Sequence, residues 1–164
     1  MKKTNNETKE LRIHGMFEPA EGTIISKVEI GSYPSNFLAM GMEIYAYDEE
    51  LGCDEAYATV TVNIGNDIGN ETLMPLFCSY VENEDNAGFD VHRFLTENGL
   101  AEPYMRRGEE VVGYSGYCSY QLFQFNADKM RELDPEGAEA YEKTYWKRFD
   151  KERKCRADVE FALT

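Results

Sequence analysis

The feature that most constrains the fold is a strict alternation of apolar and polar residues in AYATVTVNI, residues 56–64. The residues on one side of such an extended chain are all apolar: Ala56, Ala58, Val60, Val62 and Ile64. A period of two, rich in β-branched and aromatic residues, is typical of a strand with one buried face. The polar second face predicts that this strand belongs to an antiparallel sheet with one side in water.

Similar patterns predict further strands at 23–30, 37–47, 73–81 and 117–125. In residues 23–30 the side predicted to be buried carries Ile24, Val28 and Ile30, and in residues 37–47 it carries Leu38, Met40, Met42, Ile44 and Ala46. Pro75 cannot donate to a ladder, so 73–81 is predicted to be an edge strand or to begin after the proline. The connection between the strands at 37–47 and 56–64 is predicted to be a hairpin loop of about eight residues.

The period changes to that of a helix at 89–98, where Val91, Phe94 and Leu95 share a face and Gly99 is placed to end the helix. Asn126 is predicted to cap a short helix to Leu133. The pair Asp134-Pro135 predicts the start of a last helix that runs into the 150s. Its apolar stripe is Ala138, Tyr141, Tyr145 and Phe149, with Trp146 beside it.

These elements predict an α+β fold, in which an antiparallel sheet of about five strands carries two or three helices packed on one face. The chain of 164 residues is expected to form a single domain, 1–164, with a disordered leader at 1–11 and a C-terminal helical region at 129–160. Residues 101–116 are predicted to be a long loop, and ENEDNAG at 82–88 a polar loop.

The formal net charge of -14 is unevenly distributed. Residues 11–100 contain sixteen acidic and three basic side chains, whereas residues 129–164 contain nine of each. Because such a surface repels phosphate, direct binding of nucleic acid is not expected. Two interpretations of the charge remain open, namely solubility and an unknown protein partner with a basic surface. Without an apolar segment of membrane-spanning length or a signal peptide, the chain is expected to be cytoplasmic, with its four cysteines reduced.

Five acids crowd into the eight residues DEELGCDE: Asp48, Glu49, Glu50, Asp54 and Glu55. A calcium loop that began at Asp48 would need glycine at its sixth position and glutamate at its twelfth, where the chain has Cys53 and Thr59. A zinc site would need more cysteine or histidine nearby. The stretch is therefore predicted to be a solvated hairpin loop, and its acids are candidates for an interaction surface.

A second candidate surface lies in residues 104–120, with Arg106, Arg107, Tyr114 and Tyr117. Arginine and tyrosine there could bind a partner or ligand, or the arginines could pair with the many carboxylates. The sequence GYSG at 113–116 does not fit the nucleophile elbow G-x-S-x-G, because its second glycine comes one residue early. No catalytic residue, cofactor or metal ligand is predicted.

The stretches YAYDEELGCDEAYATVTVNIG, FLTENGLAEP, GYSGYCSYQLFQFN and RELDPEG resemble the recurring blocks of domain-of-unknown-function family 4313. The resemblance covers roughly residues 37–141 and implies a bacterial protein of gut Firmicutes, often near mobile genetic elements. It implies no activity, cofactor or catalytic residue.

Three hypotheses about function follow. The first is a non-enzymatic cytoplasmic interaction or accessory protein of a mobile element. The second is a nucleic-acid-mimicking inhibitor of a host DNA-binding or defence protein. The third is a small enzyme or ligand-binding protein that uses residues 104–120.

Overall fold

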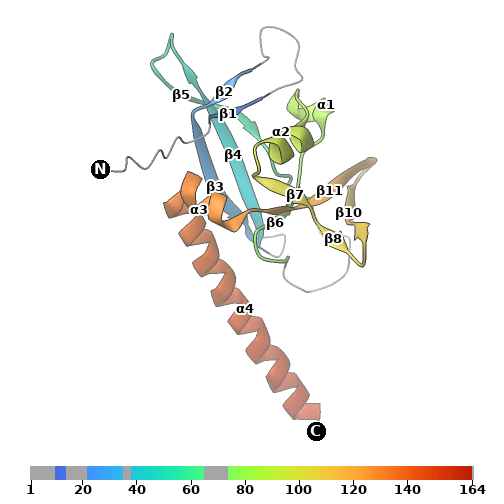
Figure 1. Ribbon diagram of the computed structural model, residues 1–164. Coiled ribbons are helices and arrows are strands. Elements are labelled where there is room, and N and C mark those ends of the chain that lie inside the picture. The colour runs from blue at the N-terminus through green and yellow to red at the C-terminus, as the bar shows by residue number, and fades with distance from the viewer. Residues whose placement is uncertain (1–9, 14–21, 35–37, 65–73, 164) are drawn as a thin grey trace, which may run out of the picture.

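The computed structural model describes residues 10–13, 22–34, 38–64 and 74–163. At 152 and 155–163 it describes the backbone alone. Antiparallel strands and helices combine in an α+β fold, as predicted (Figure 1). One sheet is formed, in spatial order, by β3 (Lys27–Tyr33), β4 (Ala39–Asp48) and β5 (Cys53–Thr59). The other is formed by β6 (Cys78–Tyr80), β7 (Ala101–Pro103), β10 (Val112–Ser115) and β11 (Cys118–Phe125). Two short pairs complete the strands: β1 (Leu11–Arg12) with β2 (Ile24–Ile25), and β8 (Met105–Arg106) with β9 (Glu109–Glu110).

The two sheets replace the single sheet of about five strands that the sequence predicts, and residues 60–62 join them. Val60 still pairs with β4, while Val62 donates from its amide to Tyr80 of β6. Thr61 forms an isolated bridge with Val81, and its hydroxyl oxygen accepts the Met42 amide at 3.0 Å. A side chain thus replaces a backbone partner at the point where the chain passes from one sheet to the other.

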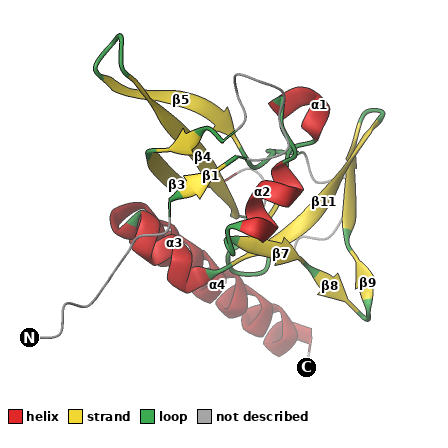
Figure 2. Cartoon of the chain, turned by 45° about the horizontal axis from the view of Figure 1, so that its top comes forward, coloured by secondary structure: helices red, strands yellow, loops and turns green. Residues whose placement is uncertain are grey.

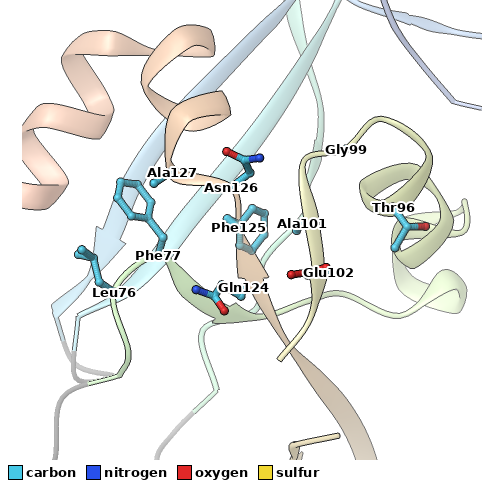
Figure 3. A pocket seen from close by; sticks show the side chains of 10 residues that line it. All are labelled: Leu76, Phe77, Thr96, Gly99, Ala101, Glu102, Gln124, Phe125, Asn126 and Ala127. Atoms are coloured by element: carbon cyan, nitrogen blue, oxygen red, sulfur yellow. The ribbon is translucent and has the colours of Figure 1, made fainter. Parts of the chain in front are cut away.

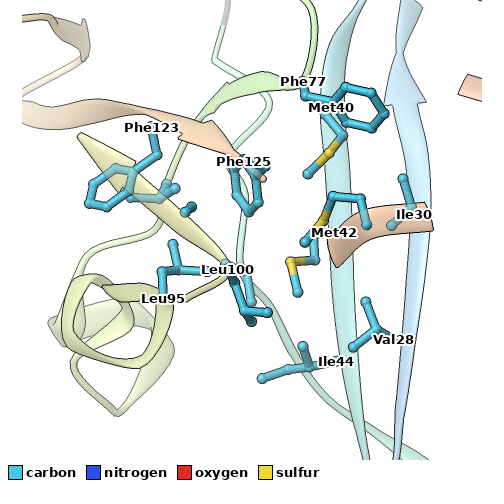
Figure 4. Close-up of a cluster of buried hydrophobic side chains, with 14 of the residues drawn as sticks. Val28, Ile30, Met40, Met42, Ile44, Phe77, Leu95, Leu100, Phe123 and Phe125 are labelled. Carbon is cyan, nitrogen blue, oxygen red and sulfur yellow. The ribbon is translucent and has the colours of Figure 1, made fainter. Parts of the chain in front are cut away.

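The core lies between the inner face of β3 and β4 and a second layer made by α2, β7 and β11 (Figure 4). The strand residues Val28, Ile30, Met40, Met42 and Ile44 are all at most 7% exposed, as their alternation predicts. Each such side chain contributes about 1.5–3 kcal/mol when fully buried. The second layer supplies Leu95, Leu100, Phe123 and Phe125.

The alternation at 56–64 holds only in part, because β5 contains a bulge. Its register shifts where Ile44 pairs with Ala58 and Tyr45 pairs with Ala56, so that Tyr57 is extra. A bulge reverses which face a side chain meets. Ala56 is consequently exposed, against the prediction. Thr61 is 2% exposed, also against the prediction, because it lies where the chain passes from one sheet to the other and pairs with Val81.

Other strand predictions also need correction. The predicted strand is interrupted at Ser26, between β2 and β3, and in β2 Ile25 is buried while Ile24 is exposed. The strand predicted at 73–81 begins only at Cys78, after the proline, which is one of the two alternatives that Pro75 suggested. Residues 1–9 of the predicted leader lie outside the described residues, and Leu11 is already part of β1.

The long loop predicted at 101–116 is wrong: the segment forms β7, β8, β9 and β10. These strands have two to four residues, too few to show a period in the sequence. The predicted polar loop at 82–88 likewise contains a single helical turn, α1 (Glu84–Ala87).

The signals at the helix ends are confirmed. α2 (Val91–Glu97) begins at Asp90, whose carboxylate accepts the Arg93 amide, and it ends before Gly99, which has φ +65°. α3 (Ala127–Leu133) is capped by Asn126, whose side chain accepts the Lys129 amide.

α4 (Pro135–Leu163) starts where Asp134-Pro135 predicts and continues past the 150s (Figure 1). Ala138, Tyr141 and Tyr145 are buried, but Phe149 is 39% exposed, so the predicted stripe ends one turn early. Among the described residues no helix is long and apolar enough to cross a membrane.

Candidate functional site

The acidic stretch forms the tip of the β4–β5 hairpin, which extends away from the rest of the fold (Figure 2). Asp48 pairs with Cys53 across the hairpin, leaving a loop of only four residues, 49–52, where about eight were predicted. One carboxylate oxygen of Asp48 accepts the amides of Glu50 at 2.8 Å and Leu51 at 3.1 Å. Gly52 closes the loop with φ +66°. Asp48 therefore stabilises the turn that displays the other acids.

The remaining four acids are exposed, and two of them, Asp54 and Glu55, face opposite sides of the hairpin. Glu49 and Glu50 lie in the turn, while Asp54 and Glu55 are neighbours on β5. Consecutive strand residues face opposite sides, so Asp54 shares a face with its cross-strand partner Tyr47, and Glu55 shares the other with Ala46. In the described part of the chain, no ion pair joins any of the four to a cation.

Two apolar side chains accompany these acids. Tyr47 is 57% exposed and Leu51 is 62% exposed. A hollow of about 410 Å³ runs along the hairpin, and its lining includes Tyr47, Glu50 and Glu55. The acidic hairpin, defined as residues 46–56, thus combines negative charge with exposed apolar surface.

The solvent face of the sheet beside this hairpin carries a small polar network. Lys27 pairs with Glu29 at 2.8 Å, and the Tyr45 hydroxyl donates to Glu29 at 2.7 Å. The hydrogen bond from Lys27 lowers the pKa of Glu29, and the hydrogen bond to Glu29 raises the pKa of Tyr45 to about 12. Lys27 also lies over the Tyr45 ring, 5.1 Å from its centroid. The cation nearest the acidic hairpin along β3 is therefore already engaged.

Residues 104–120 form two hairpins where a loop was predicted. β8 and β9 meet through Arg107 and Gly108, both with positive φ (54° and 79°), as a type I′ turn requires. β10 and β11 meet through Gly116 and Tyr117, with φ +61° at the glycine, as in a type II′ turn. The sequence GYSGYC, residues 113–118, therefore contains the end of β10, a two-residue turn and the first residue of β11.

The structure places all four candidates of this region at the surface but does not bring them together into a pocket. Tyr117 at its turn is fully exposed, and Tyr114 is 64% exposed. Arg106 and Arg107 are exposed and form no ion pair with a described carboxylate. The interpretation in which these arginines pair with carboxylates of the chain would require such ion pairs. Figures 1 and 2 both show these hairpins well apart from the acidic hairpin, so the predicted residues occupy two surfaces.

A groove of about 680 Å³ lies between the β7–β11 pair and the segment before β6 (Figure 3). Its lining includes Phe77, Thr96, Glu102 and Gln124. Glu102 is the one titratable side chain among the lining residues, whereas acid–base chemistry needs a second group within reach. The sequence patterns gave no signal for this groove.

The described cysteines and histidine do not form a catalytic pair. His92 packs against the Phe123 ring with centroids 4.9 Å apart. Cys78 is buried, and burial raises the pKa of its thiol to about 12, while Cys53 and Cys118 are exposed at the two hairpins. His14 lies outside the described residues. No group of three or more potential metal ligands converges among the residues that the structure describes.

Sequence reasoning missed the role of RELDPEG in holding α4 to the sheet. The Asp134 carboxylate accepts the Gly137 amide at 3.1 Å and, through its other oxygen, the Ile30 amide of β3 at 2.9 Å. A Cβ at Gly137 would lie 2.6 Å from the Ile30 carbonyl oxygen. Asp134 thus caps α4 and also covers the edge of β3. This structural role accounts for Asp134 and Gly137 in the block without a catalytic role.

A family model described as a domain of unknown function (DUF4313) matches residues 28–145. No curated protein and no solved structure matches the chain.

Proposed function

The chain belongs to the DUF4313 family, and we propose that it is a non-enzymatic binding protein whose acidic hairpin engages a partner protein with a basic surface. The observation that supports this most is the composition of the hairpin tip. Glu49, Glu50, Asp54 and Glu55 are exposed, and within the described residues their carboxylates have no cationic partner.

Charge at a projecting tip attracts a basic partner and raises the rate of encounter. Affinity also needs side chains that exclude water, and Tyr47 and Leu51 provide them at the same tip. The hydrogen bonds from Glu50 and Leu51 to Asp48 hold the turn in one conformation, which lowers the entropy lost on binding.

Nucleic-acid mimicry is the less well supported alternative. A mimic would need carboxylates in a row that follows a phosphate backbone. Here Asp54 and Glu55 face opposite sides of the hairpin. A role for residues 104–120 as a ligand site is also less well supported, because neither of the two hollows described above is lined by Arg106, Arg107, Tyr114 or Tyr117.

We further propose that the protein works in the bacterial cytoplasm as an accessory factor of a mobile element. The support is the family resemblance together with the reduced cysteines that the sequence suggests. Genes for conjugation or defence beside this gene in several genomes would support the proposal, and neighbours limited to metabolic enzymes would contradict it.

The test of the binding surface compares two variants of equal charge. The hairpin variant carries Glu49→Gln, Glu50→Gln, Asp54→Asn and Glu55→Gln, and it retains Asp48 because that side chain holds the turn. The control variant carries Glu84→Gln, Glu102→Gln, Glu109→Gln and Glu110→Gln, four exposed acids elsewhere. Each variant and the wild type are immobilised and exposed to bacterial lysate. We expect basic proteins to bind the wild type and the control and to be lost from the hairpin variant. Equal capture by both variants, or no capture at low salt, would overturn the proposal.

A further inference from the structure

Strand β5 is an open edge of the first sheet. It pairs with β4 on one side, and in the described part of the chain no other backbone group bonds to it. Figure 2 shows β5 at the margin of its sheet, beside β4. The opposite edge of the sheet is covered, because Asp134 accepts the Ile30 amide of β3. An uncovered edge presents main-chain donors and acceptors with which another extended chain can pair.

The register shows which main-chain groups of β5 face outward. The Tyr45 carbonyl accepts the Ser26 amide, so Tyr45 directs its main-chain groups toward the β3 side of β4. Ala56, its partner on β5, therefore belongs to a pair that is not hydrogen-bonded. Hydrogen-bonded and non-hydrogen-bonded pairs alternate along an antiparallel ladder. Glu55 thus bonds to β4, whereas Asp54 and Ala56 direct their N–H and C=O groups away from it.

The side chains of this edge carry negative charge on both faces. Asp54 and Glu55 are exposed and face opposite sides, and within the described residues neither has a cationic partner. A second copy of β5 would bring acidic side chains together at one interface, and like charges across a strand pair are unfavourable. Basic side chains on an added strand would instead form opposite-charge pairs. The charge of the edge therefore disfavours self-pairing and favours a basic strand.

The surface beside the outward-facing groups can also hold a long basic side chain. Ala56 lies on the same face as Asp54, and its small side chain leaves the approach to that carboxylate open. Tyr47, the cross-strand partner of Asp54, is 57% exposed. The hollow of about 410 Å³ along the hairpin is lined in part by Tyr47, Glu55 and Ala56. The apolar stem of a lysine or arginine can lie against this ring while its charged end reaches the carboxylate.

A second strand, β10, also lacks a partner on its outer side among the residues that the structure describes. It has four residues, against seven in β5, and its sequence VGYS carries no charge. Length and charge complementarity therefore single out β5 as the edge for a basic segment.

We propose that an extended segment of the partner, rich in lysine or arginine, adds to β5 as a further strand of the sheet. The inference rests on the proposed function, since it takes the acidic hairpin as the binding surface and names what binds there. Main-chain hydrogen bonds to Asp54 and Ala56 set the register of the added strand. Its basic side chains alternate between the faces and meet Asp54 on one face and Glu55 on the other. Binding therefore requires free amides in the partner segment as well as its positive charge.

Two labelled peptides test the proposal by fluorescence anisotropy at low salt. Both have the same sequence of lysine and valine, with lysines on both faces of the extended chain. In one of them the central amides are N-methylated, which keeps the charge and removes the hydrogen-bond donors. We expect the wild type to bind the unmethylated peptide at least tenfold more tightly than the methylated one. The control variant should behave as the wild type does, and the hairpin variant should bind both peptides weakly.

Hydrogen exchange of single amides locates the added strand on the wild-type chain. The amides of Asp54 and Ala56 should exchange rapidly in the free protein and at least tenfold more slowly in the presence of the unmethylated peptide. The Glu55 amide is the internal control. Because it already bonds to β4, it should be protected with and without the peptide.

The possible failures separate this inference from the proposed function. Equal affinity for the two peptides, or no gain of protection at Asp54 and Ala56, would overturn strand addition and leave the acidic hairpin as a charged surface. Protection of these two amides in the free protein would show that this chain or a second copy already covers the edge, and would overturn strand addition as well. No binding of either peptide by the wild type, or equal binding by the wild type and the hairpin variant, would contradict the proposed function itself.

Discussion

At the scale of single residues, Asp134 and Gly137 show how a short motif fixes a tertiary contact. Local rules predict Asp134-Pro135 as a helix start, and the structure confirms it. The same carboxylate also accepts the Ile30 amide, 104 residues away in sequence. The glycine is needed because the first turn of α4 lies against the backbone of β3. No local pattern reports such a contact, since the partner is remote in sequence.

Gly137→Ala is expected to destabilise the fold by about 1–3 kcal/mol, the usual effect of overpacking a close contact. The added Cβ would lie 2.6 Å from a backbone oxygen, which cannot move without shifting β3. Gly31→Ala is the control, because a Cβ there would meet no atom within 4 Å. Urea unfolding of both variants measures the difference. A Gly137→Ala protein as stable as the wild type would show that the helix does not approach β3 this closely.

Substitutions at two buried residues with aliphatic hydroxyl groups, Thr61 and Ser79, are expected to have opposite outcomes. Thr61 accepts the Met42 amide at 3.0 Å and lies 2.7 Å from the Tyr33 hydroxyl, whereas the Ser79 hydroxyl has no partner among the described residues. Thr61→Val should cost about 1–3 kcal/mol because it leaves buried polar groups unpaired, and Ser79→Ala should be neutral or stabilising. The denaturant concentrations at the unfolding midpoints of the two variants measure these changes in stability. Equal losses in the two variants would contradict the hydrogen-bond assignment.

Cys78 predicts a loss of stability at alkaline pH. Burial raises the pKa of its thiol from the usual 9.0 to about 12. Above pH 9 the unfolded chain therefore releases a proton that the folded chain keeps, so the free energy of unfolding falls as the pH rises toward 12. Cys78→Ala should flatten this decline, which unfolding curves at several alkaline pH values would measure. An unchanged slope would contradict the prediction.

At the scale of elements, α4 holds the segment before β6 through two tyrosines. The Tyr141 hydroxyl accepts the Phe77 amide at 2.9 Å, and the Tyr145 hydroxyl donates to the Met74 carbonyl at 2.7 Å. Phe77 has φ +58°, an unusual value for a bulky residue, and its ring lies 5.0 Å from that of Tyr141. The helix therefore maintains a backbone conformation that the segment would not adopt alone.

Tyr141→Phe keeps the ring but leaves the Phe77 amide without its partner, so we expect a loss of about 1–3 kcal/mol. Tyr114→Phe, at an exposed tyrosine of β10, is the matched control and should change little. Thermal unfolding compares the two. If both variants unfold at the wild-type temperature, the contact between α4 and Phe77 does not stabilise this segment.

The elements that sequence predicts well are those with local signals. The three longer helices have capping residues, and β3, β4 and β11 have enough residues for alternation to show. The prediction fails at the β5 bulge, where one extra residue reverses the faces, and in 101–116, where the strands are too short for a period. Of the candidate site, the hairpin and its acids could be predicted. The position of Tyr47 and Leu51 at the same tip follows only from the shorter loop that the structure shows.

At the scale of the whole molecule, two parts extend from one packed body. The acidic hairpin has no cationic partner within the described residues, and the last turns of α4, residues 146–163, carry both acidic and basic residues. The body between them supplies neither paired catalytic groups nor converging metal ligands in the part that the structure describes. The acidic hairpin is the surface on which the proposed binding function rests.

The salt dependence of binding tests the central claim most directly. The partner captured by the wild type is titrated against the wild type, the hairpin variant and the control variant at several salt concentrations. Charge at the acidic hairpin predicts that affinity for the wild type and the control falls steeply with salt, because exposed charges are screened beyond about 10 Å at ~0.1 M salt. The hairpin variant should bind at least tenfold more weakly at low salt and show a flatter dependence. If the hairpin variant and the control bind with the same affinity and the same salt dependence, the acidic hairpin is not the binding surface.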